Sequence, residues 1–183
     1  RREQEDLSGA ALVELLREAG ADVIAHEVLS DDPEALADSL REYAGRDDVN
    51  LIITTGGTGF GPRDNTPEVT REVIEREAPG LAEAMRAESL KHTPMAMISR
   101  GVCGICSDAL IVNLPGSPKA VRESFAVIRP VLHHAVALLL ARDKMADTLF
   151  ARAVEAVLRE CVKRNHFGWI LEVQAQAIAV DWD

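Results

Sequence analysis

The chain has 183 residues, 47% of them hydrophobic, which is enough to bury a sizeable core in one domain without disulfide bonds. Its formal net charge of −10 disfavours a nucleic-acid partner, and no apolar run reaches the ~18 residues of a membrane span. The three cysteines, an odd number, favour a reducing compartment such as the cytoplasm.

The first part of the chain alternates helix and strand patterns. Residues 8–20 predict a helix with Ser8 as its N-cap, and residues 33–45 predict a second helix. Residues 21–29 and 49–55 are apolar runs that predict strands. An α-β-α-β order predicts a parallel sheet with right-handed crossovers.

The stretch from Thr54 to Glu68, TTGGTGFGPRDNTPE, joins the second strand to a helix. Its four glycines allow positive φ angles and close approach of a ligand, and successive N–H groups in such a loop can form an anion nest. The helix that starts at Pro67, with Thr66 as its cap, would add a partial positive charge. Arg63 adds a full charge, and Asp64 adds a carboxylate of the kind that holds Mg²⁺. The stretch therefore predicts a phosphate site, although a purely structural glycine-rich turn is the alternative.

The later part of the chain predicts more helices and one more buried strand. The elements expected in chain order are helices at 67–77 and 80–90, a short apolar segment at 95–98, a strand at 109–114, a turn at 115–118, and helices at 119–129 and 130–142. The strand tips before Gly56 and Pro115 would share the carboxyl edge of the sheet, where open α/β sheets bind ligands. Arg100, Lys119 and Arg122 would lie near that edge.

Residues 143–183 differ from the rest. They predict an amphipathic helix over 145–166 and a strand over 169–180, and they carry no chemical motif. The sequence thus predicts a main domain at 1–142 and an additional segment at 143–183.

Four motifs in one order resemble the MogA/MoaB family of molybdenum cofactor biosynthesis, which includes the G domain of gephyrin and the molybdopterin adenylyltransferases. The motifs are TTGGTGxGPRDxTPE, PGLAEAMR from Pro79, SRG from Ser99 and LIVNLPGSPKAV from Leu110. They look most similar to the MoaB-type domains. The resemblance implies a three-layer α/β/α sandwich with a mostly parallel sheet, and a homotrimer. It also implies transfer of AMP from Mg²⁺-ATP to the terminal phosphate of molybdopterin, with release of pyrophosphate.

The resemblance assigns roles to particular residues. Asp64 and Asp31 match acidic positions that serve catalysis and hold Mg²⁺. The residues that match the phosphate loop and the second wall of the pocket are Thr55, Gly56, Gly57, Thr58, Gly59, Arg63, Ser99, Asn113, Pro115, Gly116 and Ser117. Contact with a molybdate-insertion or MoaC-type protein is also implied.

Several structural alternatives stay open. Asp31 and Asp32 are also suited to cap the helix at Pro33. Residues 113–116 could form only a turn. Phe60 could stack on a pterin or adenine ring, or it could cover the core.

The chain departs from the family pattern in two places. It begins with Arg1 and lacks the first strand that family members carry before the helix near Asp6, so it looks like a fragment unless the strand at 169–180 takes that place. Cys103 and Cys106 form a lone CxxC pair, which we interpret as incidental rather than as a zinc or redox site.

Two other functions compete with adenylyl transfer. One is a non-catalytic module that binds molybdopterin through the same loops. The other is a nucleotide pyrophosphatase, although distant relatives of that type lack the GPRDxTPE continuation.

Overall fold

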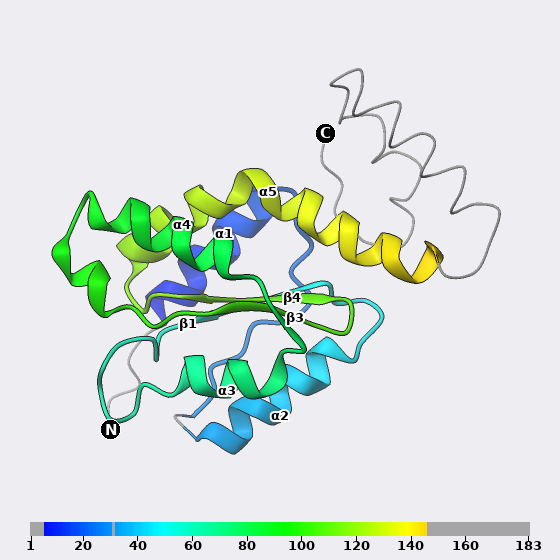
Figure 1. The fold of residues 1–183 in the computed structure, drawn as a ribbon, viewed down its shortest axis with the longest axis horizontal. Helices are drawn as coiled ribbons and strands as arrows, with labels where there is room; N and C mark the ends of the chain where they lie inside the picture. Colours follow the sequence, from blue (N-terminus) through cyan, green and yellow to red (C-terminus); the bar gives the residue numbers. More distant parts are fainter. Residues whose placement is uncertain (1–5, 31, 146–183) are drawn as a thin grey trace.

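The computed structural model describes residues 6–30 and 32–145, and in this part of the chain a sheet lies between two layers of helices (Figure 1). The helices are α1 (Leu7–Glu18), α2 (Pro33–Ala44), α3 (Thr66–Val73), α4 (Pro79–Leu90) and α5 (Pro118–Met145), with a 3-10 helix, η1, at Pro94–Ile98. The strands are β1 (Leu51–Thr55), β2 (Arg76–Glu77), β3 (Cys103–Cys106) and β4 (Ala109–Leu114). Helices α1, α4 and α5 cover one face, and α2 and α3 cover the other (Figure 1). The predicted three-layer α/β architecture is confirmed.

The sheet is mixed and has the strand order β1-β4-β3-β2 among the described residues. Strands β1 and β4 are parallel, with Leu51 opposite Leu110 and Thr55 opposite Leu114. The pairs β4–β3 and β3–β2 are antiparallel. Because β1 and β4 run in the same direction, the loops that follow them leave the sheet side by side. This one parallel pair therefore creates the carboxyl edge that the sequence predicts.

Strand β4 is buried on both faces, which explains its nearly continuous apolar sequence. Leu110, Val112 and Leu114 pack toward α1, α4 and α5, whereas Ile111 packs toward α2 and α3. The period of two residues that separates these faces is the normal alternation of a strand. A rigid β4 fixes the position of the loop that follows it.

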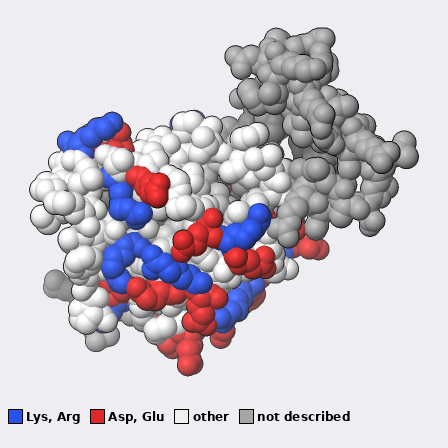
Figure 2. Space-filling view, in the orientation of Figure 1, with Lys and Arg blue, Asp and Glu red and all other residues white. Residues whose placement is uncertain are grey.

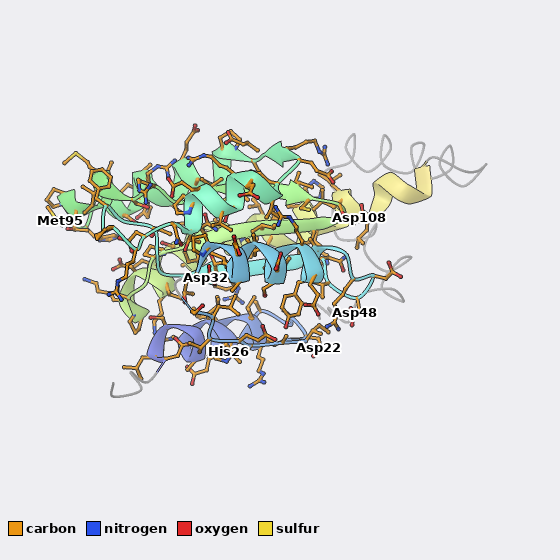
Figure 3. All side chains as sticks on the ribbon, turned by 90° about the horizontal axis from the view of Figure 1, so that it is seen from below. Asp22, His26, Asp32, Asp48, Met95 and Asp108 are labelled. Atoms are coloured by element: carbon orange, nitrogen blue, oxygen red, sulfur yellow. The ribbon has the colours of Figure 1, made fainter. Side chains whose placement is uncertain are left out.

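Residues 21–29 do not form the predicted strand. Apart from an isolated bridge at Ala21 they are an extended connection, and Val28 is 78% exposed. A strand requires a neighbour for its N–H and C=O groups, and the described sheet ends at β1 without including this stretch. Side chains hold it instead: His26 contacts Asp6, and Glu27 accepts a hydrogen bond from the Tyr43 hydroxyl at 2.6 Å. Figure 3 shows His26 and Asp22 on this stretch, beside α1.

Helix α3 is shorter than predicted because the chain turns into the sheet. The helix ends at Val73, and residues 76–77 pair with β3. The backbone N–H groups of Glu75 and Ala78 donate to the Ile105 and Cys103 carbonyls, both at 2.8 Å. Tertiary pairing here overrides a helical pattern that continues through the sequence.

Pro130 does not interrupt the last helix, contrary to the prediction, because α5 is continuous from Pro118 to Met145. A proline inside a helix leaves the carbonyl four residues earlier without a donor. That residue, Ala126, is exposed like Pro130 itself, so water can satisfy its carbonyl. Phe125 and Ile128 on the opposite side are buried in the core and hold the helix in place.

Residues Pro118–Leu140 of α5 are long and apolar enough to cross a membrane by length and composition alone. Such a helix is weak evidence for a membrane span, because core helices have the same composition. Val121, Phe125, Ile128 and Leu132 are buried against the sheet and its neighbouring helices.

Asp6, and not the predicted Ser8, caps α1. Its Oδ1 accepts a hydrogen bond from the Gly9 N–H at 2.8 Å, and its Oδ2 lies 2.9 Å from His26 Nε2. The Gly9 hydrogen bond is the main cause that lowers the pKa of Asp6, and His26 lowers this pKa further. Ser8 instead lies in the first turn, where its hydroxyl donates to the Gly116 carbonyl at 2.7 Å.

We expect Asp6→Ala to lower the free energy of unfolding by about 1 kcal/mol near neutral pH, because the cap is lost. The unfolded chain binds the Asp6 proton more readily than the folded chain, since the folded pKa is the lower one. The contribution of the charge is therefore complete above the unfolded pKa and disappears as pH falls through the folded pKa. Urea unfolding across this pH range measures the effect. Asp6→Asn keeps the cap acceptor, so it should cost less; an equal loss would contradict the capping role.

The predicted helix at 145–166 and strand at 169–180 lie outside the described residues, apart from the end of α5, and so does Asp31. The division at residue 142 stays a prediction.

Candidate functional site

Two loops meet at the carboxyl edge of the parallel strand pair. The glycine loop, defined here as Gly56–Asp64, follows β1, and the loop Pro115–Ser117 follows β4. The Gly56 N–H donates to the Leu114 carbonyl at 3.1 Å, and a Cβ atom on Gly116 would lie 3.1 Å from the Gly56 Cα. The backbones are thus in direct contact.

The first two glycines of the loop have positive φ angles, 92° at Gly56 and 64° at Gly57. A Cβ atom on Gly57 would lie 2.3 Å from the Thr66 Oγ1, a distance that no real side chain tolerates. The Thr66 hydroxyl is in turn fixed, because it donates to the Gly56 carbonyl at 3.1 Å. Glycine is therefore required at this position for both conformation and space.

Four successive carbonyl groups of the loop point toward the start of α3 and toward Arg100. The carbonyls of Gly56 and Gly57 accept from the Thr66 hydroxyl and N–H, at 3.1 and 3.2 Å. The carbonyls of Thr58 and Gly59 accept from the backbone N–H and the Nε of Arg100, at 2.9 and 2.6 Å.

The orientation of these carbonyls determines the orientation of the amides. All peptide bonds of the described chain are trans, so each C=O points opposite to the N–H of the next residue. The N–H groups of Gly57 and Thr58 therefore point away from Thr66, and those of Gly59 and Phe60 point away from Arg100. Successive backbone amides of a glycine-rich loop can bind an anion where they converge on one point.

The start of α3 contributes less to an anion site than the sequence predicts. Asn65 occupies the N-cap position without a side-chain cap bond, and Thr66, the predicted cap, uses its hydroxyl within the glycine loop. The Thr66 N–H bonds to the Gly57 carbonyl. The first turn of the helix thus stabilises the loop.

Asp64 folds back against the glycine loop. Its Oδ2 accepts a hydrogen bond from the Gly61 N–H at 2.8 Å, and its own N–H donates to the Gly61 carbonyl at 3.0 Å. A Cβ atom on Gly59 or Gly61 would lie within 2.9 or 2.7 Å of this oxygen. The carboxylate therefore lies against the Gly59–Gly61 part of the loop, where it can bind a Mg²⁺ ion that also takes phosphate oxygens as ligands.

Asn113, a predicted pocket residue, is only 2% exposed. Its Nδ2 donates to the hydroxyls of Thr54 and Thr70 at 3.0 and 2.9 Å, and its Oδ1 accepts from the Val102 N–H at 3.1 Å. The side chain thus joins β1, α3 and the start of β3 beneath the loops. Sequence reasoning did not foresee this supporting network.

The other predicted residues have different positions. Ser99 precedes Arg100 and so lies beside the glycine loop, whereas Arg63 is exposed on that loop. The Ser117 Oγ accepts from the Ala120 N–H at 3.2 Å near the start of α5. Asp31 lies outside the described residues. Its neighbour Asp32 caps α2, because its Oδ1 accepts a hydrogen bond from the Glu34 N–H at 3.1 Å. Phe60 is 69% exposed, so it does not cover the core.

Charges near the site are largely paired with one another. The Lys119 ammonium lies 3.7 Å from the Glu123 carboxylate, and the Arg122 guanidinium lies 3.7 Å from the Glu14 carboxylate. Arg100 pairs with Glu68. Charges of both signs are interspersed over the region of α2 and α3 in the face that Figure 2 shows. This pattern fits recognition by a few local groups and not by a broad basic surface.

The two cysteines of the CxxC pair cannot act together. Both lie on β3, with Cys103 packed toward α1, α4 and α5 and Cys106 toward α2 and α3. Burial raises the pKa of Cys103 to about 11, and it also raises that of Cys106. Because their side chains lie on opposite faces of β3, the two thiols do not meet to form a disulfide or to share a metal ion in this structure.

Comparison with known proteins identifies the family. Residues 1–134 match the model of the probable molybdopterin binding domain. The chain belongs to this family of molybdopterin-binding domains. It is 40% identical over 138 residues to the molybdopterin adenylyltransferase of Helicobacter pylori strain J99, a match that covers 74% of this chain and 78% of that protein.

Two further relatives cover different shares of their own length. The molybdenum cofactor synthesis protein cinnamon of Drosophila melanogaster is 44% identical over 164 residues, which is 89% of this chain but only 26% of that protein. The solved structure of the molybdopterin biosynthesis enzyme MoaB of Thermus thermophilus is 49% identical, with a TM-score of 0.70 over 75% of this chain and 86% of that one. The family membership suggested by the motifs is thus confirmed.

Proposed function

We propose that this chain is a molybdopterin adenylyltransferase of molybdenum cofactor biosynthesis. The observation that carries the proposal is the glycine loop whose carbonyls are held by Thr66 and Arg100, with the Asp64 carboxylate folded against it. The name of the Helicobacter relative supports the same activity. The substrates are ATP and molybdopterin, and the site residues are those predicted from the motifs, with Asn113 acting from beneath the loops.

In the proposed reaction an oxygen of the terminal molybdopterin phosphate attacks the α-phosphorus of ATP. The bond between that phosphorus and the oxygen that bridges to the β-phosphate breaks, and pyrophosphate leaves with the electron pair. The attacking phosphate is already ionised near neutral pH, so no general base is required. Such a reaction depends on positioning and charge neutralisation, which backbone amides and a carboxylate can provide.

Mg²⁺ suits this arrangement, although the described residues contain no group of three or more metal-binding side chains. Mg²⁺ typically takes one or two carboxylates and completes its shell with waters and substrate phosphates, so Asp64 can serve as the protein ligand. When bound, Mg²⁺ supplies neutralisation of the phosphate charge. Asp31 is proposed as the second acidic residue on the resemblance alone.

The direct test is to incubate the full chain with Mg²⁺-ATP and molybdopterin and to measure adenylylated molybdopterin by mass spectrometry. The proposal expects product and pyrophosphate in equal amounts. Tight molybdopterin binding without product would indicate a binding module. Release of AMP and pyrophosphate from ATP without molybdopterin would indicate a pyrophosphatase.

A homotrimer in the cytoplasm is part of the proposal, together with contact to a molybdate-insertion or MoaC-type protein. Exposed apolar side chains support an interface formed by the end of α4, η1 and Phe60 of the glycine loop, each at least 42% exposed: Phe60, Leu90, Met95, Met97 and Ile98. Met95 lies at the tip of the molecule in Figure 3. Light scattering should give three times the chain mass; a monomer would refute the trimer.

A further inference from the structure

Arg100 connects three parts of the site through one side chain. Its Nε donates to the Gly59 carbonyl at 2.6 Å, one terminal nitrogen donates to the Asp64 carbonyl, and the other pairs with the Glu68 carboxylate. The side chain is 30% exposed. The guanidinium is thus directed at protein acceptors, and this is not the position expected for a group that holds phosphate itself.

The backbone around Arg100 is fixed by the core. The Arg100 N–H donates to the Thr58 carbonyl, and Arg86 donates to the Gly101 carbonyl at 2.8 Å. Val102 and Asn113 exchange two hydrogen bonds, at 3.0 and 3.1 Å. Because the backbone at this point is already fixed, binding of the guanidinium to the loop costs mainly the rotamer entropy of the side chain.

Two peptide groups depend on the guanidinium in particular. The Gly59 carbonyl fixes the Gly59–Phe60 peptide, and the Asp64 carbonyl fixes the Asp64–Asn65 peptide. The peptides before Gly59 are fixed by Thr66 and by the Arg100 backbone, which a side-chain substitution leaves in place. The Arg100 side chain therefore controls the Phe60 amide and the position of Asp64.

We infer that Arg100 is a positioning residue for the transfer reaction, an inference that rests on the proposed function. It holds two carbonyls on the inner side of the loop, so that the Phe60 N–H and the Asp64 carboxylate face the phosphates of the substrate. Glu68 balances its charge from the outer side. The fork of an arginine reaches several acceptors at once, whereas a lysine offers only a point charge.

The test compares the full-length wild type with Arg100→Gln and Arg100→Lys, using inorganic pyrophosphate with Mg²⁺ as the probe. Amide shifts of the loop in nitrogen-15 NMR spectra report which N–H groups bind. In the wild type, the amides of residues 57–60 should shift on titration. In R100Q the Phe60 response should be lost and the Kd should rise about ten-fold, which corresponds to about 1.4 kcal/mol. R100K should lie between the two.

Arg41→Gln is the matched control. Arg41 lies on α2 and, like Arg100, it joins two elements through an ion pair, since its guanidinium lies 2.7 Å from the Glu72 carboxylate. R41Q should bind pyrophosphate like the wild type. Wild-type affinity together with a wild-type Phe60 shift in R100Q would overturn the inference while leaving the proposed function intact. If R100Q does not fold, the R100K variant provides the test. Unchanged pyrophosphate binding by R100K would also overturn the inference. No loop response in the wild type would overturn both.

Discussion

Replacing Asp64 with asparagine is expected to reduce the rate of adenylyl transfer by about a hundred-fold or more and to leave molybdopterin binding nearly unchanged. The Asp64 side chain has two roles, since it accepts a hydrogen bond from the Gly61 N–H and carries a charge. Asparagine keeps an acceptor for that N–H, so the loop retains its shape. Only the charge that would hold Mg²⁺ disappears. Steady-state rates with ATP and molybdopterin, together with a pterin binding titration, measure the two effects.

Asp48→Asn is the control for this substitution. Asp48 precedes β1 at the opposite end of the molecule from Met95 (Figure 3), where it pairs with Arg46 at 2.7 Å. An exposed ion pair of this kind contributes little to stability. D48N should therefore retain wild-type rate and binding. If D64N instead loses pterin binding as much as rate, Asp64 shapes the pterin site and the assigned role is wrong.

Gly57→Ala should have the second large effect. Gly57 has φ +64°, a conformation that costs any other L-residue about 1–2 kcal/mol. A methyl group there would also lie 2.3 Å from the Thr66 Oγ1 and so displace the hydroxyl that holds the Gly56 carbonyl. We expect a loss of about 2–3 kcal/mol in stability and at least a ten-fold loss of pyrophosphate affinity. Urea unfolding and a pyrophosphate titration measure these quantities.

Gly80→Ala is the matched control, because Gly80 lies in the first turn of α4 and a Cβ atom there would meet nothing within 4 Å. Stability should stay the same or rise by about 0.5–1 kcal/mol. Wild-type pyrophosphate binding by G57A would mean that the conformation of the glycine loop does not determine the anion site.

The sequence predicts the elements whose structure is decided locally. Strand β4 is a run of buried residues, and α2 and α4 carry a Pro at their first positions with an apolar stripe behind it. The predicted strand at 21–29 and the predicted end of the helix at residue 77 were wrong. In both places the structure depends on whether a neighbouring strand is available for pairing. Strand β3 was not predicted, since the four residues CGIC are too few to show a pattern.

Prediction of the site from the sequence has the same limit, because distant contacts decide part of its structure. Gly56 and Gly57 were identified from the motif, because a glycine-rich loop reports its own backbone requirements. The contacts that shape the loop come from residues distant in sequence: Arg100 reaches Gly59, and Asn113 reaches Thr70. Such contacts cannot be derived from spacing in one chain. A buried asparagine between apolar residues in a strand is the one signal that could have indicated the Asn113 network.

The central claim is that the backbone amides of the glycine loop, with Asp64 beside them, hold the phosphates of the substrate. A crystal structure of the full chain with Mg²⁺ and a non-hydrolysable ATP analogue measures this directly. We expect phosphate oxygens about 3 Å from the N–H groups of residues 57–60, with Mg²⁺ on Asp64. Phosphates bound at another part of the fold, with the loop amides turned to protein groups, would contradict the claim.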